Sequence, residues 1–318
     1  RFGGTIEIDD AWKLGIDHIA IATGAGKPTI VKIKNNLIRG IRKASDFLMG
    51  LQLTGAAKKD SLANLMLQLP AVVIGGGLTA IDTTTEAFAY YPIQVEKFLD
   101  RYEGSVAEFG EEKVMSMYDE EEKGIAKTFL EHGAAIRAER KRAAEAGEEP
   151  NFVPLVRNWG GVTLCYRKTV NDSPAYRLNH EEVIKSLEEG IYYWEKMSPV
   201  EAIPNEYGAV KEMIFRKQGK TNEGKYIELD ETVTLPAKTV IVAAGTSPNV
   251  IYEREHPGTF ELDEWKQFFQ TYKLGENGEL VKTDKTETGF FTSYLADGKY
   301  VTVYGDNHPR YAGNVVKA

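Results

Sequence analysis

The sequence predicts an α/β fold built on a parallel sheet, and three observations support this prediction. Short apolar runs end in glycine turns, which is typical of buried strands. One of these runs, residues 71–74, leads directly into a glycine-rich turn that opens a helical pattern. The chain has 318 residues, 42% of them hydrophobic and 27% charged, which is enough for one large core or two medium ones. We therefore expect an ordinary globular α/β chain.

The first part of the chain alternates between short strands and helices. The first predicted strand covers residues 16–22, and residues 29–43 are expected to be an irregular connector. Ser45 is predicted to cap a helix over residues 45–51. A second helical stretch is predicted over residues 62–69, before the strand at residues 71–74.

Residues 91–158 are rich in Glu, Lys, Arg and Ala and are predicted to be mostly helical. Ile125, Phe129 and Ile136 fall at helical spacing and form one apolar stripe, which His132 joins. The acidic run at residues 119–122 is interpreted as a solvated helix face, because consecutive carboxylates on a helix point in different directions.

The last part of the chain is rich in strands. A helix is predicted over residues 181–189, and two strands that precede the strand at 239–244 suggest a β-meander crossover. The predicted strands are residues 161–166, 210–215, 226–233, 239–244 and 300–304.

The glycine loop after residues 71–74 is the strongest functional signal. Gly75 permits a tight turn, Gly77 lets the backbone approach phosphate groups, and Ala80 allows close packing of helix on sheet. The free N–H groups at the start of the helix then bind the pyrophosphate of a dinucleotide. The sequence therefore predicts a Rossmann-like dinucleotide-binding unit, and the alternative is a tight strand-to-helix turn with no ligand.

The end of the following strand indicates which nicotinamide cofactor binds. Arg167 and Lys168 are adjacent cations with no acid beside them, which favours the 2′-phosphate of NADP(H) over the free ribose of NAD(H). The alternative is a pair of solvated surface charges. About 90 residues separate Gly75 from Tyr166, whereas a plain β-α-β unit takes about 30. Residues 91–158 are therefore interpreted as an insertion.

Composition excludes several other functions. The net charge of −8 disfavours nucleic acid as a partner, and no apolar run approaches the roughly 20 residues of a membrane span. Cys165 is the only cysteine, so the chain holds no internal disulfide, thiol relay or iron–sulfur cage, and we expect a reducing, cytoplasmic location. The histidines are too dispersed for a metal site. No residue is nominated as catalytic and none as a metal ligand.

Several motifs together resemble the two-dinucleotide-domain flavoproteins. The resemblance is strongest to the NADPH-oxidising small subunit of glutamate synthase and its relatives, the pyridine nucleotide-disulfide oxidoreductase-like flavoproteins. It covers almost the whole chain except residues 91–158. The matching segments are Ile21-Ala22-Thr23-Gly24, residues 27–28 and 44–48, residues 73–82, Tyr166-Arg167-Lys168 with residues 173–175, residues 235–249 and Tyr304-Gly305-Asp306.

The resemblance implies two cofactors, with hydride passing from NADPH to FAD. The residues it places at NADPH are Gly75, Gly76, Gly77, Leu78, Thr79, Ala80, Arg167, Lys168 and Gly245. Those it places at FAD, which we expect only in the full-length protein, are Thr23, Gly24 and Asp306. An iron–sulfur or other electron-acceptor domain or subunit is the partner it implies.

The resemblance also implies a domain organisation. Residues 1–45 correspond to part of an FAD-binding domain and its connector, and residues 46–245 to an NAD(P)-binding domain with the insertion at about 91–158. Residues 246–318 correspond to the incomplete C-terminal part of the FAD-binding domain. Because the FAD pyrophosphate loop of the family is expected before Arg1, we expect the chain to be a piece of a longer polypeptide.

Two functional hypotheses follow. The first is an NADPH-binding portion of a flavin-dependent oxidoreductase that passes electrons to an acceptor outside this chain. The alternative is a non-catalytic interaction or assembly domain that retains the dinucleotide-binding fold. Leu78 motivates this alternative, since it replaces an asparagine usual in the family, and so does the charged insertion.

Overall fold

The computed structural model describes residues 3–16, 19–21, 23–276, 279–284, 291–296 and 299–305. The chain divides into two compact units. One is Ile30–Gly245, and the other combines Arg1–Thr29 with Thr246–Ala318. Each unit is considered separately.

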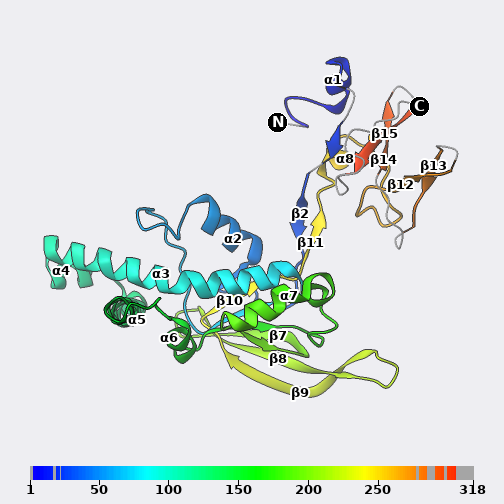
Figure 1. Ribbon diagram of the computed structural model, residues 1–318. Helices are drawn as coiled ribbons and strands as arrows, with labels where there is room; N and C mark the ends of the chain where they lie inside the picture. The colour runs from blue at the N-terminus through cyan, green and yellow to red at the C-terminus, as the bar shows by residue number, and fades with distance from the viewer. Residues whose placement is uncertain are drawn as a thin grey trace. The chain divides into compact units, whose positions relative to one another are not determined.

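The unit Ile30–Gly245 is built on a parallel five-stranded sheet (Figure 1). The strand order is β3-β10-β4-β5-β6, and every neighbouring pair is parallel. The prediction of an α/β fold with a parallel sheet is therefore confirmed. The strands are β3 (Ile41–Lys43), β10 (Thr239–Val242), β4 (Ala71–Ile74), β5 (Val162–Cys165) and β6 (Tyr192–Trp194).

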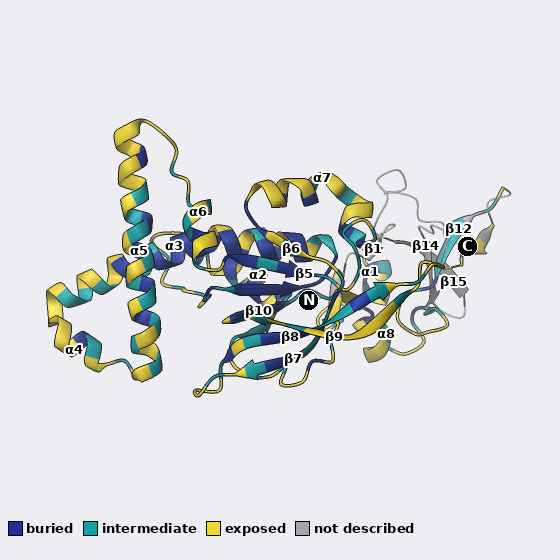
Figure 2. Ribbon diagram, turned by 90° about the horizontal axis from the view of Figure 1, so that it is seen from below, coloured by how far each residue is buried: buried dark blue, intermediate teal, exposed yellow. Residues whose placement is uncertain are grey.

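The centre of this sheet forms the core of the unit. All four residues of β4 are buried, as continuous apolar strands are when both faces of a parallel sheet are covered. One face packs against helices through Val73, and the other contributes Val72 to a second apolar cluster. Figure 2 shows the buried strands β5 and β10 beside helices that expose one side.

The second apolar cluster is shared between the parallel sheet and a three-stranded antiparallel β-meander, β7-β8-β9. Its strands are β7 (Met197–Pro204), β8 (Val210–Lys220) and β9 (Tyr226–Pro236). Met213 and Phe215 of β8 are fully buried in that cluster. The meander leads directly into β10, so the predicted β-meander crossover is present.

The helix after the glycine loop is longer than the sequence analysis predicts. Helix α3 (Leu78–Phe109) has 32 residues and continues past Tyr91, where the insertion was expected to begin. Pro92 is buried inside it. The remaining helices of this arm are α4 (Glu111–Ser116), α5 (Glu120–Ala146) and α6 (Val153–Asn158). The arm is therefore an extension of the first dinucleotide-fold helix, which α5 packs against.

The predicted helix over residues 62–69 is wrong, because this segment forms neither a helix nor a strand. The amide of Leu65 donates a hydrogen bond to the Tyr90 hydroxyl, and that of Leu67 donates to Gln94 Oε1. These side-chain acceptors replace the carbonyls that a helix would have used. Pro70 also disfavours helical geometry at the residue before it.

Three other element boundaries differ from the prediction. The expected connector at residues 29–43 contains the edge strand β3. Helix α2 (Ala44–Leu53) begins after Lys43, so Ser45 lies inside it and does not cap it. Helix α7 (Pro174–Glu188) begins seven residues before the predicted start at residue 181, because Ser173 accepts a hydrogen bond from the Tyr176 amide at its N-cap.

The other unit contains a five-stranded sheet in the order β1-β15-β14-β12-β13 and a short ribbon of β2 with β11. Ile8, Tyr252 and Phe260 form its buried cluster. Its helices are α1 (Ile8–Lys13) and α8 (Ile251–Glu255). Its strands are β1 (Ala20–Ile21), β2 (Ala25–Pro28), β11 (Thr246–Pro248), β12 (Thr271–Leu274), β13 (Leu280–Lys282), β14 (Phe291–Ala296) and β15 (Lys299–Gly305).

In the part of the chain that the structure describes, none of the helices combines the length and the apolar character needed to cross a lipid bilayer.

Candidate dinucleotide-binding site

Four strands of the parallel sheet end in register. Val242 of β10 lies opposite Ile74 of β4, and Ile74 lies opposite Cys165 of β5. Cys165 in turn lies opposite Trp194 of β6. The loops that follow these strands therefore emerge at one edge of the sheet, which is where ligands bind in open α/β folds.

The first two glycines of the loop have no room for a side chain. A Cβ atom on Gly75 would lie 2.3 Å from the Ala243 carbonyl oxygen, and one on Gly76 would lie 2.3 Å from the Tyr166 ring. Gly75 also donates its amide to the Cys165 carbonyl, at 3.1 Å. These glycines bring the ends of β4, β10 and β5 into close contact.

The third glycine faces open space. A Cβ atom on Gly77 would meet nothing within 4 Å. Gly77 is the N-cap of α3, no side chain caps the helix there, and the first turn carries no acidic residue. Thr79 is exposed and Ala80 is fully buried against the sheet. The start of α3 therefore presents backbone N–H groups and the positive end of a helix dipole to the edge of the sheet.

Leu78 has a packing role that its position in the glycine loop did not predict. It is half-buried and packs against the main apolar core. The leucine at this position therefore anchors the first turn of α3, in addition to lacking the hydrogen-bonding amide that the family resemblance led us to expect.

Arg167 and Lys168 lie directly beyond the end of β5. Arg167 is exposed, and Lys168 is half-buried with its ammonium nitrogen 5.7 Å from the centre of the Tyr226 ring. The Lys196 amide, just after β6, donates a 3.1 Å hydrogen bond to the Lys168 carbonyl oxygen. The backbone that carries the two cations is therefore fixed to the neighbouring strand end.

Two carboxylates near these cations are already engaged. Glu195 accepts a hydrogen bond from the Val170 amide. Asp172 accepts hydrogen bonds from Lys220, Tyr226 and Thr169, and these donors hold the pKa of Asp172 well below its usual value. Neither acid is presented as an acceptor for a ribose hydroxyl. This cluster was not predicted, because Asp172 and Tyr226 are 54 residues apart in sequence.

Gly245 is the last residue of this unit and follows β10. It is exposed and adopts a left-handed backbone conformation, with φ of +91°. Two residues earlier, the Ala243 amide donates to the Ile74 carbonyl at 2.8 Å. The structure therefore brings all the residues predicted for NADPH to the same edge of the sheet.

The residues predicted for FAD belong to the other unit. The Thr23 hydroxyl donates to the Asn249 carbonyl at 3.0 Å, and the Asn249 side-chain amide donates to the Thr23 carbonyl at 3.2 Å. Gly24 has φ of +67° and accepts a hydrogen bond from the Asn249 amide. Asp306 lies outside the described residues. Thr23 and Gly24 thus hold the β2–β11 ribbon together.

Cys165 is fully buried at the end of β5, and burial raises the pKa of its thiol. This thiol is a small core side chain, as predicted from its position in a strand. Among the described residues, no group of three or more His, Cys, Asp and Glu side chains is placed to hold a metal ion.

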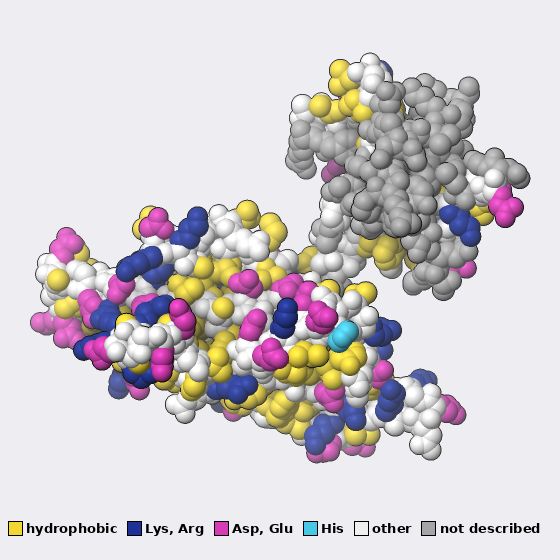
Figure 3. All heavy atoms as spheres, viewed as in Figure 1, with side chains coloured by type: hydrophobic (Ala, Val, Ile, Leu, Met, Phe, Trp, Pro, Cys, Tyr) yellow, Lys and Arg dark blue, Asp and Glu magenta, His cyan; other side chains and the backbone are white. Residues whose placement is uncertain are grey.

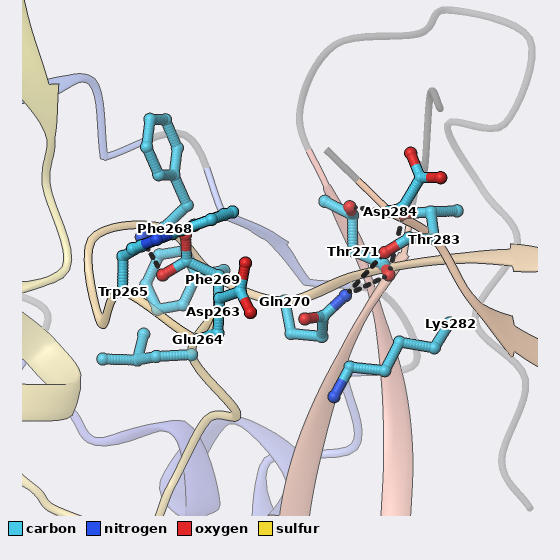
Figure 4. A pocket seen from close by; sticks show the side chains of 11 residues that line it. Asp263, Glu264, Trp265, Phe268, Phe269, Gln270, Thr271, Lys282, Thr283 and Asp284 are labelled. Carbon is cyan, nitrogen blue, oxygen red and sulfur yellow. Dashed lines mark hydrogen bonds between the residues drawn. The ribbon is translucent and has the colours of Figure 1, made fainter. Parts of the chain in front are cut away.

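A separate hollow of about 670 Å³ lies in the unit that contains β12 and β13. Figure 4 shows Trp265 and Phe268 at one side of it and Thr271 and Thr283 at the other. Gln270 donates hydrogen bonds to the carbonyls of both threonines, each at 3.0 Å. None of the predicted cofactor residues within the described segments lines this hollow.

The chain has a curated sequence relative. No family model matches the chain. The chain is 36% identical over 262 residues to the uncharacterized protein RP006 of Rickettsia prowazekii (strain Madrid E). The aligned region covers 79% of this chain and 35% of that protein, so the chain spans about a third of the length of this curated relative.

Several solved structures are similar to the chain at low identity. FprA from Mycobacterium tuberculosis is 13% identical with a TM-score of 0.44, over 83% of this chain and 56% of that one. FprA in complex with NADPH is 14% identical with a TM-score of 0.42, again over 83% of this chain and 56% of that one. An FAD-dependent pyridine nucleotide-disulphide oxidoreductase from Desulfovibrio vulgaris is 13% identical with a TM-score of 0.38, over 90% of this chain and 59% of that one. The fold class follows from the strand order and register of this chain itself.

Proposed function

We propose that this chain is the NADPH-binding portion of a flavin-dependent oxidoreductase. The observation that carries the proposal is the convergence of a glycine loop, a helix N-terminus and two cations at one edge of a parallel sheet. In the proposed reaction, hydride passes from NADPH to FAD and electrons then pass to an acceptor outside this chain, as in the glutamate synthase small subunit.

The residues at the sheet edge fit the chemistry of a dinucleotide phosphate. A backbone carbonyl at Gly75 and the Tyr166 ring at Gly76 leave no space for side chains, while the space beside Gly77 is open. The amides at the start of α3 would hold the pyrophosphate. Arg167 and Lys168 would bind the 2′-phosphate, for which arginine offers paired N–H donors.

The chain's own task in this proposal is binding and orientation. NADPH supplies the hydride when it is bound, and that transfer needs no acid or base from the protein. The glycine loop fixes the position of the pyrophosphate, and the cations fix the far end of the cofactor. Gly245, at the end of the neighbouring strand, keeps the backbone there free of a side chain.

FAD and the electron acceptor belong to the proposal for the longer protein. The Thr23 hydroxyl donates its proton to the Asn249 carbonyl within its own unit, and the proposal places FAD in the longer protein. We further propose a cytoplasmic location and an iron–sulfur or other electron-acceptor partner, since the single cysteine is buried and no thiol relay is available in this chain.

The test is a pair of calorimetric titrations of the chain, one with NADPH and one with NADH. We expect NADPH to bind at least about tenfold more tightly, because only NADPH carries the 2′-phosphate. A chain that is folded by circular dichroism but binds neither nucleotide would overturn the proposal. Tighter binding of NADH would show that Arg167 and Lys168 do not serve the 2′-phosphate.

A second candidate function is a non-catalytic interaction or assembly domain. The observation that favours it is the helical arm, which exposes Phe109 and Met117 near α4. Figure 3 shows that acidic and basic side chains are interspersed over this arm. The same titrations separate the two candidates, because an assembly domain that has lost the cofactor would show no binding of either nucleotide.

A further inference from the structure

The loop that carries the two cations is fastened by the end of the β8–β9 hairpin. Lys220, the last residue of β8, forms a 2.7 Å ion pair with Asp172. Tyr226, the first residue of β9, donates its hydroxyl proton to the same carboxylate oxygen at 2.5 Å. The Tyr226 oxygen also accepts the Thr169 amide at 3.1 Å. In Figure 1 this end of the hairpin lies on the same side of the unit as the start of α3.

This attachment differs from the other ion pairs of the hairpin. Lys217 pairs with Glu231, and Arg216 pairs with Glu228, so both of these contacts link β8 to β9. Among the cations of β8 that the structure describes, Lys220 is the one whose ion-pair partner lies outside the hairpin. Its partner lies four residues after Lys168, in the loop that follows β5.

The arrangement also neutralises the negative charge of Asp172. An unpaired Asp172 carboxylate would repel an anion bound at Lys168. The Lys220 ammonium group compensates that charge, and the hydroxyls of Tyr226 and Thr169 donate hydrogen bonds to the same Asp172 oxygen. The Lys168 and Lys220 ammonium nitrogens lie 5.7 and 5.2 Å from the centre of the Tyr226 ring, within the range of cation–π attraction.

We propose that the end of the β8–β9 hairpin is a specificity element for the 2′-phosphate of NADPH: Tyr226 and Lys220 hold and neutralise Asp172, and so present Lys168 and Arg167 to that phosphate. This inference rests on the proposed function. Tyr226, Lys220 and Asp172 are positioning residues, because they act through the loop and not by touching the cofactor.

The first test uses Tyr226→Phe and Lys220→Gln, with NADPH and NADH titrated into each variant. Tyr226→Phe keeps the ring but loses the hydroxyl that joins Thr169 to Asp172. We expect NADPH to bind about tenfold more weakly to each variant, with NADH changed by less than about twofold, since a lost charge-assisted hydrogen bond is worth about this much. Lys217→Gln is the matched control, because it removes a cation from the same strand whose partner is Glu231.

The second test separates charge from general stability. Adding Asp172→Asn to Lys220→Gln removes the uncompensated carboxylate, so we expect the double variant to recover most of the lost NADPH affinity. A purely structural role predicts the opposite, because the double variant would then be at least as impaired as Lys220→Gln alone. The cycle measures the coupling between the two residues directly.

The outcomes distinguish this inference from the proposed function. Wild-type chain that prefers NADPH, together with variants whose NADPH to NADH ratio is unchanged, would overturn the inference and leave the proposed function standing. Equal loss of both nucleotides in Tyr226→Phe would also overturn it, since that result indicates a general loss of the site. Wild-type chain that binds neither nucleotide would overturn both.

Discussion

The three glycines after β4 lack side chains for different physical reasons. At Gly75 and Gly76 the protein itself occupies the space, since an added Cβ would collide with the Ala243 carbonyl or with the Tyr166 ring. At Gly77 the protein leaves the space open. The sequence pattern identifies all three positions, but only the structure shows which of them serves the fold and which is available to a ligand.

This difference leads to a prediction for two alanine variants. Gly75→Ala should destabilise the chain by about 2 kcal/mol or more, because the Cβ would lie 2.3 Å from a backbone oxygen that cannot easily move. Gly77→Ala should leave the urea midpoint almost unchanged but weaken NADPH binding about tenfold, because the methyl group would occupy the approach to the pyrophosphate. Unchanged NADPH affinity in a folded Gly77→Ala chain would place the pyrophosphate elsewhere.

Arg167 provides a second prediction at the residue scale. Arg167→Glu replaces an exposed cation by an anion at the end of β5. NADPH should bind roughly ten- to a hundredfold more weakly and NADH almost as before, because the substitution both removes an attraction and adds a repulsion. Titration calorimetry of the variant measures this, with Lys127→Glu on α5 as the control of equal charge change. Equal affinities for NADPH in wild type and Arg167→Glu would show that this side chain does not contact the 2′-phosphate.

Among the elements, the arm formed by α3 and α5 is held at its base by an aromatic cluster. The His132 ring stacks on Trp159 with 3.8 Å between ring centres, and its Nδ1 atom lies 2.6 Å from the Tyr91 hydroxyl. Burial lowers the pKa of His132 below its usual value, because the charged ring is poorly solvated there. The folded arm therefore favours neutral His132.

A pH dependence of stability follows from this cluster. Because the pKa of His132 is lower in the folded chain than in the unfolded chain, the stabilisation is fully present above the ordinary histidine pKa of about 6.5 and is lost as the pH falls below it. Urea unfolding at pH 7.5 and 5.5 should show a smaller loss of stability on acidification in His132→Phe than in wild type. His180→Phe, at an exposed position on α7, is the control. An equal loss in His132→Phe and wild type would contradict this account.

Sequence patterns predicted some of these elements correctly and missed features of others. Continuous apolar runs identified β4, β5 and β10, because the parallel sheet buries both of its faces. The acidic run at residues 119–122 was interpreted only as a solvated face, yet Asp119 and Glu122 form a capping box that starts α5. An aspartate three residues before a glutamate is the sequence pattern that would have predicted this capping box.

Tertiary contacts decided what the sequence could not. Residues 62–69 were predicted to be helical, but the amides of Leu65 and Leu67 donate to side chains of α3 and not to carbonyls within a helix. Lys97 adds three hydrogen bonds from its buried ammonium group to carbonyls of residues 56, 58 and 63. None of these partners is adjacent in sequence, so local propensity alone could not reveal them.

At the scale of the whole molecule, the sequence predicted only part of the candidate site. The glycine loop and the cations were found from local motifs, whereas the attachment of Asp172 to Tyr226 required the structure. The two units carry different parts of the proposed chemistry. The unit Ile30–Gly245 holds every residue predicted for NADPH, and the residues predicted for FAD fall outside it.

This division predicts the colour of the purified chain. We expect the 318-residue chain to purify without stoichiometric FAD. Among the described residues, the glycine-rich phosphate loop at residues 75–80 is assigned to NADPH, and the Thr23 hydroxyl is hydrogen-bonded to Asn249. The measurement is the absorbance at about 450 nm, where oxidised flavins absorb. A flavin to protein ratio near one would contradict this expectation.

The most direct test of the central claim is amide hydrogen exchange of the chain with and without saturating NADPH. The account predicts slower exchange in peptides that cover residues 75–80 and 166–172, because bound cofactor would engage the start of α3 and stabilise the loop after β5. NADH should protect residues 75–80 but have a smaller effect on residues 166–172. Protection confined to other segments, such as the hollow lined by residues 262–271, would contradict the assignment of the nucleotide to the carboxyl edge of the parallel sheet.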